Sequence, residues 1–252
     1  MSFPLPRIIA HRGAKSFAPE NTLSAFKLAR AHGASWVEFD VQLTRDEVPV
    51  ILHDNSLART SNGAGLVYEQ NYADIARLDC GSWFGREFAG ETIPTLAQTL
   101  DYLMSVNLHA NIEIKDAPQE AQNIKTARVV CDLLRRLPAH SCHFLLSSFS
   151  FAALTSLRQY APTAAIGMLL DINDWERDWL QRKGEISALF TELNCDSLNV
   201  SQAILTEERI AVLKTVCPRI LTYTVNDKYR AAELLNWGVT GVFSDILTQD
   251  DL

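Results

Sequence analysis

The chain has 252 residues, 47% of them hydrophobic and 21% charged, which is enough to bury one large core. Its formal net charge is −7, with 30 acidic against 23 basic residues and no Lys/Arg-rich run, which argues against a surface for nucleic acid or anionic membranes. The five cysteines are scattered without a C-x-x-C pair, which is typical of reduced thiols and not of disulfides or a zinc site. The N-terminus shows no secretory signal pattern and no apolar stretch is long enough to span a bilayer, so we expect a cytoplasmic protein that needs no membrane.

Short apolar runs alternate with amphipathic stretches along the chain, which is typical of βα units and a parallel sheet. We expect strands at residues 7–10, 36–44, 48–53, 110–115, 143–147, 164–170, 197–200, 220–226 and 241–244. We expect helices from a cap at Asn21 or Thr22 to about His32, at residues 95–106 and 118–137, up to residues 160 and 193, and at residues 207–216 and 228–237.

The second strand is followed by a turn at Arg45-Asp46-Glu47 instead of a helix, so residues 48–53 return as the second arm of a hairpin. Setting that arm aside leaves eight strands, the number that closes a (β/α)8 TIM barrel, which we favour over an open doubly wound sheet. No glycine-rich fingerprint follows the first strand, which removes the main support for a dinucleotide-binding fold. We therefore expect one domain over residues 1–252, with residues 54–92 as an inserted cap segment.

Charged residues gather at the carboxyl ends of the predicted strands, the edge at which TIM barrels carry their active sites. These residues are His11, Arg12, Glu38, Asp40, Glu113 and Lys115. The last four form two pairs with i, i+2 spacing, which places both members of each pair on the same face of a strand.

The carboxylates Glu38, Asp40 and Glu113 would repel one another in a barrel interior unless a positive charge lay among them. A divalent cation, Mg²⁺ or Ca²⁺, suits oxygen ligands, and the absence of clustered Cys and His argues against zinc. The alternative is a set of ordinary salt bridges with Arg12 and Lys115. The convergence of three carboxylates at strand ends favours the metal.

The hairpin brings a second histidine toward this cluster. Pairing Thr44 with Val48 sets His53 opposite Phe39, between the two carboxylates of the second strand. Two histidines, His11 and His53, beside a metal suit acid/base work on a phosphate ester.

Arg12 and Lys115 would neutralise the charge that develops on the phosphoryl oxygens. Residues 147–149 and 223–226 also end strands and are weaker candidates for substrate contact. Trp83 and Phe84 of the insert are more typical of a satellite core than of a substrate wall.

Several motifs together resemble the glycerophosphodiester phosphodiesterase family, in particular its short bacterial cytosolic members associated with glycerol-3-phosphate uptake. They are AHRG at residues 10–13, APENT at 18–22, EFDVQLTRDEVPVILHD at 38–54, IPTL at 93–96, IEIK at 112–115 and YTVN at 223–226. Family members usually have Trp in place of Tyr223, and often T-D-x-P in place of Ser244-Asp245-Ile246-Leu247. These departures concern the shape of the glycerol or alcohol pocket.

The resemblance implies a TIM barrel with an insertion after the H-D motif, a divalent metal, and cleavage of glycerophosphodiesters to glycerol 3-phosphate and an alcohol. It places His11 and His53 as the acid/base pair. It matches Glu38, Asp40 and Glu113 to the metal ligands, and Arg12 and Lys115 to the phosphate-contacting residues. Two alternatives stay open, a lysophospholipase D or lyase of the same fold and a catalytically silent phosphodiester-binding module.

Overall fold

Apolar runs with buried side chains on both faces form the sheet that the sequence predicts. The structure is a computed structural model that describes residues 5–171, 179–246 and 248–251. Its strands are β1 (Ile8–Ala10), β2 (Trp36–Leu43), β3 (Pro49–Ile51), β4 (His109–Ile114), β5 (Phe144–Ser148), β6 (Ala165–Leu170), β7 (Ser197–Ser201), β8 (Ile220–Tyr223) and β9 (Gly241–Ser244). Its α-helices are α1 (Leu23–Ala31), α2 (Tyr72–Ile75), α3 (Leu96–Ser105), α4 (Glu120–Arg135), α5 (Phe151–Tyr160), α6 (Trp179–Glu192), α7 (Glu207–Leu213) and α8 (Lys228–Asn236). Short 3₁₀ turns lie at η1 (Val67–Glu69), η2 (Arg86–Phe88), η4 (Gln202–Ile204) and η5 (Gln249–Asp251).

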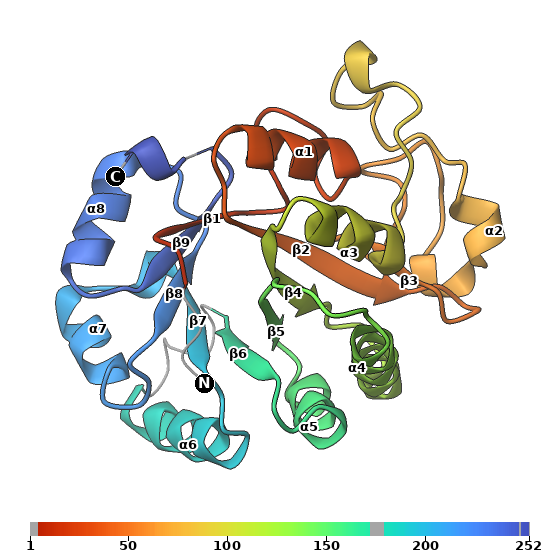
Figure 1. Ribbon diagram of the computed structural model, residues 1–252. Coiled ribbons are helices and arrows are strands. Elements are labelled where there is room, and N and C mark those ends of the chain that lie inside the picture. The colour runs from red at the N-terminus through yellow and green to blue at the C-terminus, as the bar shows by residue number, and fades with distance from the viewer. Residues whose placement is uncertain (1–4, 172–178, 247, 252) are drawn as a thin grey trace.

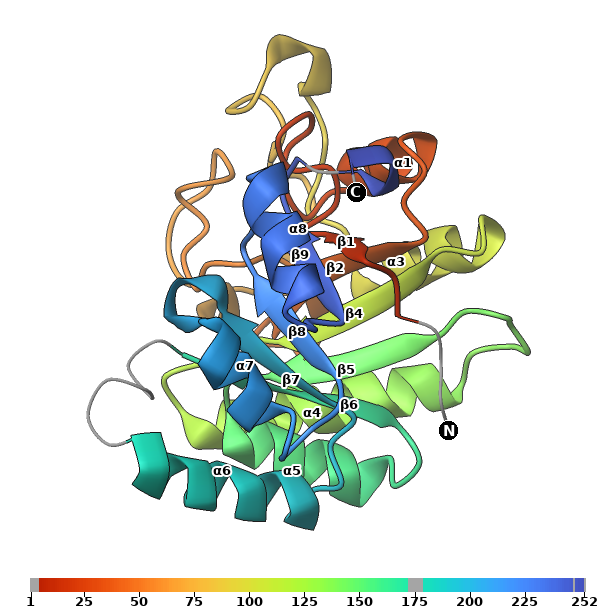
Figure 2. The same ribbon diagram turned by 90° about the vertical axis from the view of Figure 1, so that its left-hand side faces the viewer.

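The sheet closes on itself. Within the described residues, every pair of neighbouring strands except β2 and β3 is parallel, and β1 pairs with both β9 and β2 (Figure 1). Helices lie around the outside of this ring, as the side view also shows (Figure 2). The predicted (β/α)8 TIM barrel is therefore confirmed.

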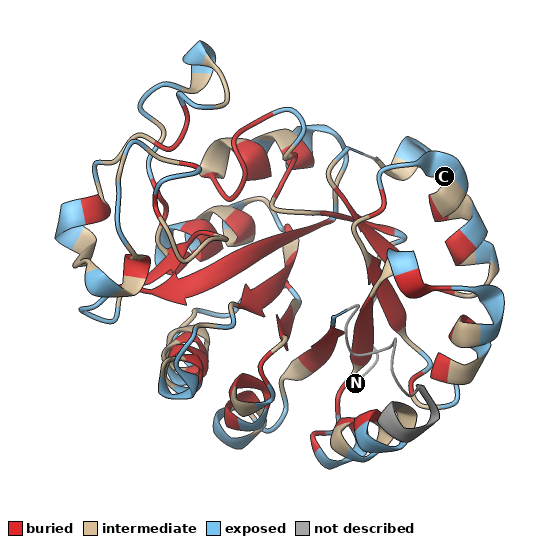
Figure 3. Cartoon of the chain, turned by 180° about the vertical axis from the view of Figure 1, so that it is seen from behind, coloured by how far each residue is buried: buried red, intermediate tan, exposed pale blue. Residues whose placement is uncertain are grey.

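Burial follows this arrangement. The strands are buried along their length, whereas the helices are buried on one side and exposed on the other (Figure 3). Phe26 of α1 packs on Phe39 of β2, with ring centroids 5.5 Å apart and both side chains fully buried. Each such side chain stabilises the fold by about 2–3 kcal/mol through removal of apolar surface from water. Within the described residues, no helix is both long enough and apolar enough to cross a membrane.

The hairpin has the predicted register. β3 is antiparallel to β2, with Leu43 opposite Pro49, and the Thr44 N–H donates to the Val48 carbonyl at 3.1 Å. The same register continues one residue beyond β3, where the backbone N–H of Leu52 donates to the carbonyl oxygen of Asp40. The next residue, His53, is thereby directed to the region of the β2 carboxylates.

The segment at residues 54–92, called the insertion below, shares with the flanking residues a small apolar core that is separate from the barrel core. The core residues of this insertion and the flanking strands are Val50, Leu52, Leu57, Val67, Ile75, Cys80 and Ile93. The part that carries η2 extends away from the barrel in both views (Figures 1 and 2). At its far end, Glu91 returns to the barrel and accepts hydrogen bonds from the backbone and hydroxyl of Ser24 at the start of α1.

Two expectations need correction. Trp83 does not belong to the satellite core: it is 44% exposed and stacks edge-on against Phe84. The strand expected at residues 220–226 is also shorter: β8 ends at Tyr223, although the N–H of Val225 still donates to the carbonyl of Phe243 in β9, and the side chain of Asn226 donates to Asp245. The start of the chain up to residue 4, the first helical turns expected after β6 and Leu247 lie outside the described residues.

Candidate active site

The loop between β1 and α1 turns sharply at the mouth of the barrel. Arg12 and Gly13 both have positive φ angles, 55° and 80°, a conformation that glycine adopts without strain. Thr22 is the predicted cap that the structure uses, and its side chain accepts a hydrogen bond from the first turn of α1. Asn21, the other predicted cap, instead donates to the carboxylate of Asp40 at 2.8 Å.

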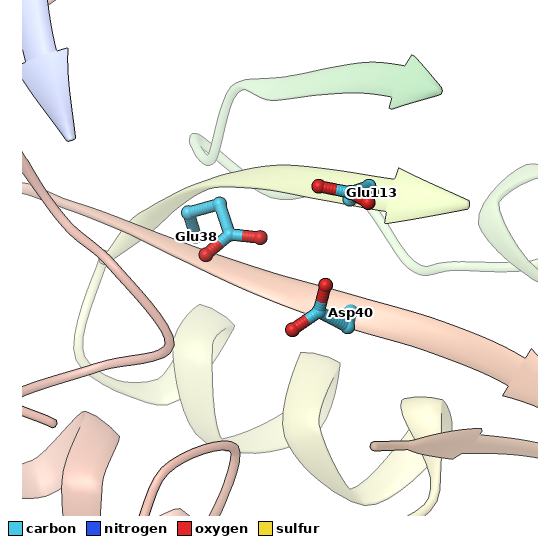
Figure 4. A group of neighbouring side chains, drawn as sticks. All are labelled: Glu38, Asp40 and Glu113. Atoms are coloured by element: carbon cyan, nitrogen blue, oxygen red, sulfur yellow. The ribbon is translucent and has the colours of Figure 1, made fainter. Parts of the chain in front are cut away.

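Three carboxylates from β2 and β4 point toward one another (Figure 4). Glu38, Asp40 and Glu113 each offer an oxygen within 4.8 Å of the other two. Their exposed fractions are 3%, 1% and 8%. The i, i+2 spacing on β2 and the register that pairs Asp40 with Glu113 account for this convergence.

Two cations lie against two of these carboxylates. Lys115 Nζ is 2.7 Å from Glu113 Oε1 and 3.3 Å from Asp40 Oδ1, and Arg12 Nε is 3.4 Å from Asp40 Oδ2. Burial would raise the pKa of the Asp40 carboxyl, but the charges of Lys115 and Arg12 hold it well below its usual range. The salt bridges considered as the alternative are thus present for Asp40 and Glu113.

Glu38 is different. Its Oε2 accepts the backbone N–H of Arg12 at 2.9 Å, but its Oε1 is buried and has no hydrogen-bond partner among the described residues. Burial, reinforced by the charges of Asp40 and Glu113, raises the pKa of Glu38 well above its usual value. An unpartnered carboxylate oxygen beside two further carboxylates fits a hard divalent cation. The residues that could hold it are Glu38, Asp40 and Glu113.

His11 is held by a carboxylate from the last strand end. Its Nδ1 lies 2.6 Å from Asp245 Oδ1, and its Nε2 lies 3.9 Å from Glu38 Oε2. Burial lowers the pKa of His11, and the hydrogen bond to Asp245 only partly offsets this. With Nδ1 bonded to Asp245, Nε2 is the nitrogen left to exchange protons.

His53 is held in the same way by the residue that follows it. Its Nδ1 lies 2.6 Å from Asp54 Oδ1. Burial lowers the pKa of His53 as well, and the attraction of Asp40 only partly offsets this. Each imidazole therefore has its Nδ1 committed to a carboxylate and its Nε2 free for chemistry.

A cavity of about 150 Å³ joins these groups. Its lining includes His11, Arg12, Glu38, His53, Glu113 and Lys115. Asp40 lies beneath this lining and meets Glu38 and Glu113 within the carboxylate cluster. Phe149, Leu169, Tyr223 and Phe243 contribute an apolar part of the wall, so the strand ends that the sequence marked as weaker candidates do reach the cavity.

The sequence interpretation missed the two aspartates that hold the histidines. Asp54 belongs to the H-D pair at the end of the hairpin, and its position beside His53 was the available signal. Asp245 follows β9, far from His11 in the chain, and only closure of the barrel brings them together. Asn226 fixes Asp245 in turn, donating to its Oδ2 at 2.9 Å.

A family model described as the glycerophosphoryl diester phosphodiesterase family matches residues 11–248. This match spans almost the whole chain and includes every residue of the site described above. The chain belongs to this family. The predictions of the family and of an enzyme of this class are therefore confirmed.

Individual relatives agree over nearly the full length. A glycerophosphodiester phosphodiesterase of Caldanaerobacter subterraneus subsp. tengcongensis is 30% identical over 243 residues, which cover 94% of this chain and 93% of the relative. A glycerophosphodiester phosphodiesterase of Bacillus subtilis is 29% identical over 251 residues, covering 94% and 82%. The structure of an Oleispira antarctica phosphodiesterase in complex with the product sn-glycerol-3-phosphate is 34% identical, with a TM-score of 0.87 and coverage of 98% of this chain and 95% of that one.

Proposed function

We propose that the protein is a metal-dependent phosphodiesterase that hydrolyses small glycerophosphodiesters, such as glycerophosphocholine and glycerophosphoethanolamine, to sn-glycerol 3-phosphate and an alcohol. The observation that carries the proposal is one cavity lined by two cations, two histidines and two members of a cluster of three carboxylates. The product complex of the Oleispira antarctica relative supports the choice of substrate class.

The carboxylate cluster has the donor set for Mg²⁺ or Ca²⁺, held by Glu38, Asp40 and Glu113. When bound, such an ion supplies Lewis-acid stabilisation of the negative charge that develops during the reaction. Arg12 and Lys115 add positive charge at the cavity wall, where they bind phosphoryl oxygens.

The two histidines divide the proton transfers in this proposal. Burial lowers the pKa of each imidazole and so favours its neutral form, which is the form that acts as a base. One imidazole accepts the proton of the attacking hydroxyl as the new oxygen–phosphorus bond forms. The other, which must start protonated on both ring nitrogens, delivers its Nε2 proton to the alcohol oxygen as the bond between that oxygen and phosphorus breaks.

The attacking hydroxyl belongs either to water or to the neighbouring glycerol carbon, which would give a cyclic phosphate first. Phosphorus NMR of the reaction mixture separates these routes. A transient cyclic glycerophosphate marks attack by the glycerol hydroxyl, and direct appearance of glycerol 3-phosphate marks attack by water.

The experiment that tests the function is release of glycerol 3-phosphate from glycerophosphocholine by purified protein freed of metal with a chelator. We expect no release without metal and recovery with Mg²⁺ or Ca²⁺. His11→Ala and His53→Ala should each lower kcat by about 100-fold or more while leaving the unfolding transition in place. His140→Ala, which changes a histidine outside the cavity, is the matched control.

Absence of release with any metal from folded protein would contradict the proposal. Turnover of lysophosphatidylcholine alone would favour the lysophospholipase D or lyase alternative, and binding without turnover would favour the silent module. The cytoplasmic location and the link to glycerol-3-phosphate uptake belong to the same proposal, and cell fractionation tests the location.

A further inference from the structure

Arg59 lies in the insertion, between β3 and η1, and reaches back to the active site. Its Nε and Nη2 donate to the two carboxylate oxygens of Asp54 at 2.5 and 3.0 Å. Its Nη1 and Nη2 donate to the two oxygens of Glu20 at 3.0 and 2.7 Å. One guanidinium therefore grips two carboxylates, each through two hydrogen bonds, a geometry that a lysine cannot reproduce.

Each of these carboxylates holds a group of the proposed catalytic machinery. Asp54 bonds the Nδ1 of His53 at 2.6 Å. Glu20 accepts a hydrogen bond from Arg12 Nη1 at 2.8 Å. The chain of contacts thus runs from His53 through Asp54, Arg59 and Glu20 to Arg12.

The burial of Glu20 indicates why the contact with Arg59 matters. The side chain of Glu20 is only 3% exposed, whereas that of Arg59 is 45% exposed. A buried carboxylate is stable only beside positive charge, and the Arg12 guanidinium does not serve Glu20 alone because it also faces Asp40. Burial raises the pKa of Glu20, but the hydrogen bonds from Arg59 and the charge of Arg12 outweigh this and lower it.

The alternative is that Arg59 forms only a stabilising ion pair between the insertion and the barrel, with no contact to the residues that position the site. An exposed ion pair contributes only about 0–1 kcal/mol and touches no functional group. Here both carboxylates are already engaged with side chains that line the cavity, namely His53 and Arg12.

We propose that Arg59 is a positioning residue that sets His53 through Asp54 and Arg12 through Glu20, so that the insertion completes the active site. This inference rests on the proposed function. It predicts that one substitution in the insertion disturbs both the proton transfer and the grip on phosphate.

The test compares Arg59→Ala and Arg59→Lys with Arg86→Ala, which removes an exposed arginine of the same insertion. Both Arg59 variants should lose about 10- to 100-fold in kcat/KM toward glycerophosphocholine at saturating metal, with kcat lowered and KM raised. Arg86→Ala should match the wild type. Millimolar guanidinium should restore part of the activity of Arg59→Ala, whereas methylammonium should not, because it lacks the forked donors.

A second readout does not depend on turnover. Nitrogen-15 NMR of labelled histidines in the metal-free protein reports which ring nitrogen of His53 carries the proton. We expect Nδ1–H in the wild type and a shift toward Nε2–H in Arg59→Ala. Arg59→Lys gives the same comparison if the alanine variant does not fold.

If the Arg59 variants keep the kcat, the KM and the His53 tautomer of the wild type and differ only in a lower unfolding midpoint, the inference is overturned. Arg59 would then be a residue that only stabilises the fold. An inactive wild type would instead contradict the proposed function. In that case the NMR comparison still decides whether Arg59 positions His53.

Discussion

At the scale of single residues, both histidines of the site are held by the same kind of contact, an aspartate carboxylate at Nδ1. His11 follows β1 and His53 follows β3. The Nδ1 of His11 contacts Asp245, and the Nδ1 of His53 contacts Asp54. The partner at one ring nitrogen determines which nitrogen is left to accept or donate a proton. Neither aspartate lines the cavity, and in the proposed reaction each acts through the histidine that it contacts.

Replacement of Asp245 tests whether its contact with Nδ1 sets the tautomer of His11. Asn226 donates to one oxygen of Asp245, so in Asp245→Asn the amide oxygen has to take that position and the NH₂ group faces His11 Nδ1. The Nδ1 of His11 then accepts instead of donating, and Nε2 carries the proton. We expect kcat to fall by about 100-fold or more, with a smaller change in KM, measured in the glycerol 3-phosphate release assay.

The control is Lys15→Met, which removes a weaker partner of Asp245 at 3.6 Å and leaves the contact with His11. Its kcat should stay within about 3-fold of the wild type. A wild-type kcat for Asp245→Asn would show that the tautomer of His11 does not limit the reaction.

At the scale of elements, the turn between β1 and α1 decides where Arg12 lies. Gly13 has a φ of +80°, and a Cβ added there would lie 2.7 Å from the Cβ of Ala25 in α1. Gly13→Ala is therefore strained both in its backbone and by contact with the helix. We expect the free energy of unfolding to fall by about 2–4 kcal/mol and kcat/KM to fall with it, measured by urea denaturation and the release assay.

Gly33→Ala separates the two causes of strain. Gly33 has a similar φ of +83°, but a Cβ there meets no atom within 4 Å. This variant should lose only about 1 kcal/mol and keep its activity. Equal losses in the two variants would show that contact with α1 contributes nothing.

The elements also show how far sequence reasoning reached. The register of the hairpin follows from its turn, so the position of His53 was predictable from Thr44 and Val48. The i, i+2 spacing similarly predicted the shared face of Glu38 and Asp40. The bridge by Arg59 was not predictable, because the insertion lacks a regular period from which the direction of a side chain follows.

At the scale of the whole molecule, barrel closure concentrates charge in one place. β1 lies between β9 and β2, so residues from both ends of the chain and from the hairpin meet at the carboxyl ends of neighbouring barrel strands. Three buried carboxylates face two cations there, and Glu38 Oε1 has no hydrogen-bond partner within the described part of the chain. The metal-free protein should therefore be less stable than the metal-loaded one, by linkage between folding and binding.

Replacement of Glu38 by glutamine tests how much this buried carboxylate destabilises the metal-free protein, through the pH dependence of the free energy of unfolding. The folded-state pKa of Glu38 is raised by burial and by its neighbours, so the folded protein holds this proton more tightly than the unfolded chain. The resulting stability is fully present below pH 4.5, the ordinary value, and is lost as the pH rises through the raised pKa. His11 and His53 act in the opposite sense, because their lowered pKa values remove stability as the pH falls below 6.5.

Both proteins carry the two histidines, so the difference in stability between variant and wild type reports mainly on Glu38 and the charges beside it. In the presence of a chelator, Glu38→Gln should be more stable than the wild type by on the order of 1 kcal/mol or more at pH 8, and this advantage should shrink toward pH 5. Added Mg²⁺ or Ca²⁺ should reverse the order, because the ion stabilises the wild type and the glutamine removes a charged ligand. Urea denaturation followed by tryptophan fluorescence measures both effects, with Glu120→Gln as the control because Glu120 is an exposed residue of the first turn of α4. A constant difference across this pH range, unaffected by metal, would mean that Glu38 neither bears the excess charge of the cluster nor binds the ion.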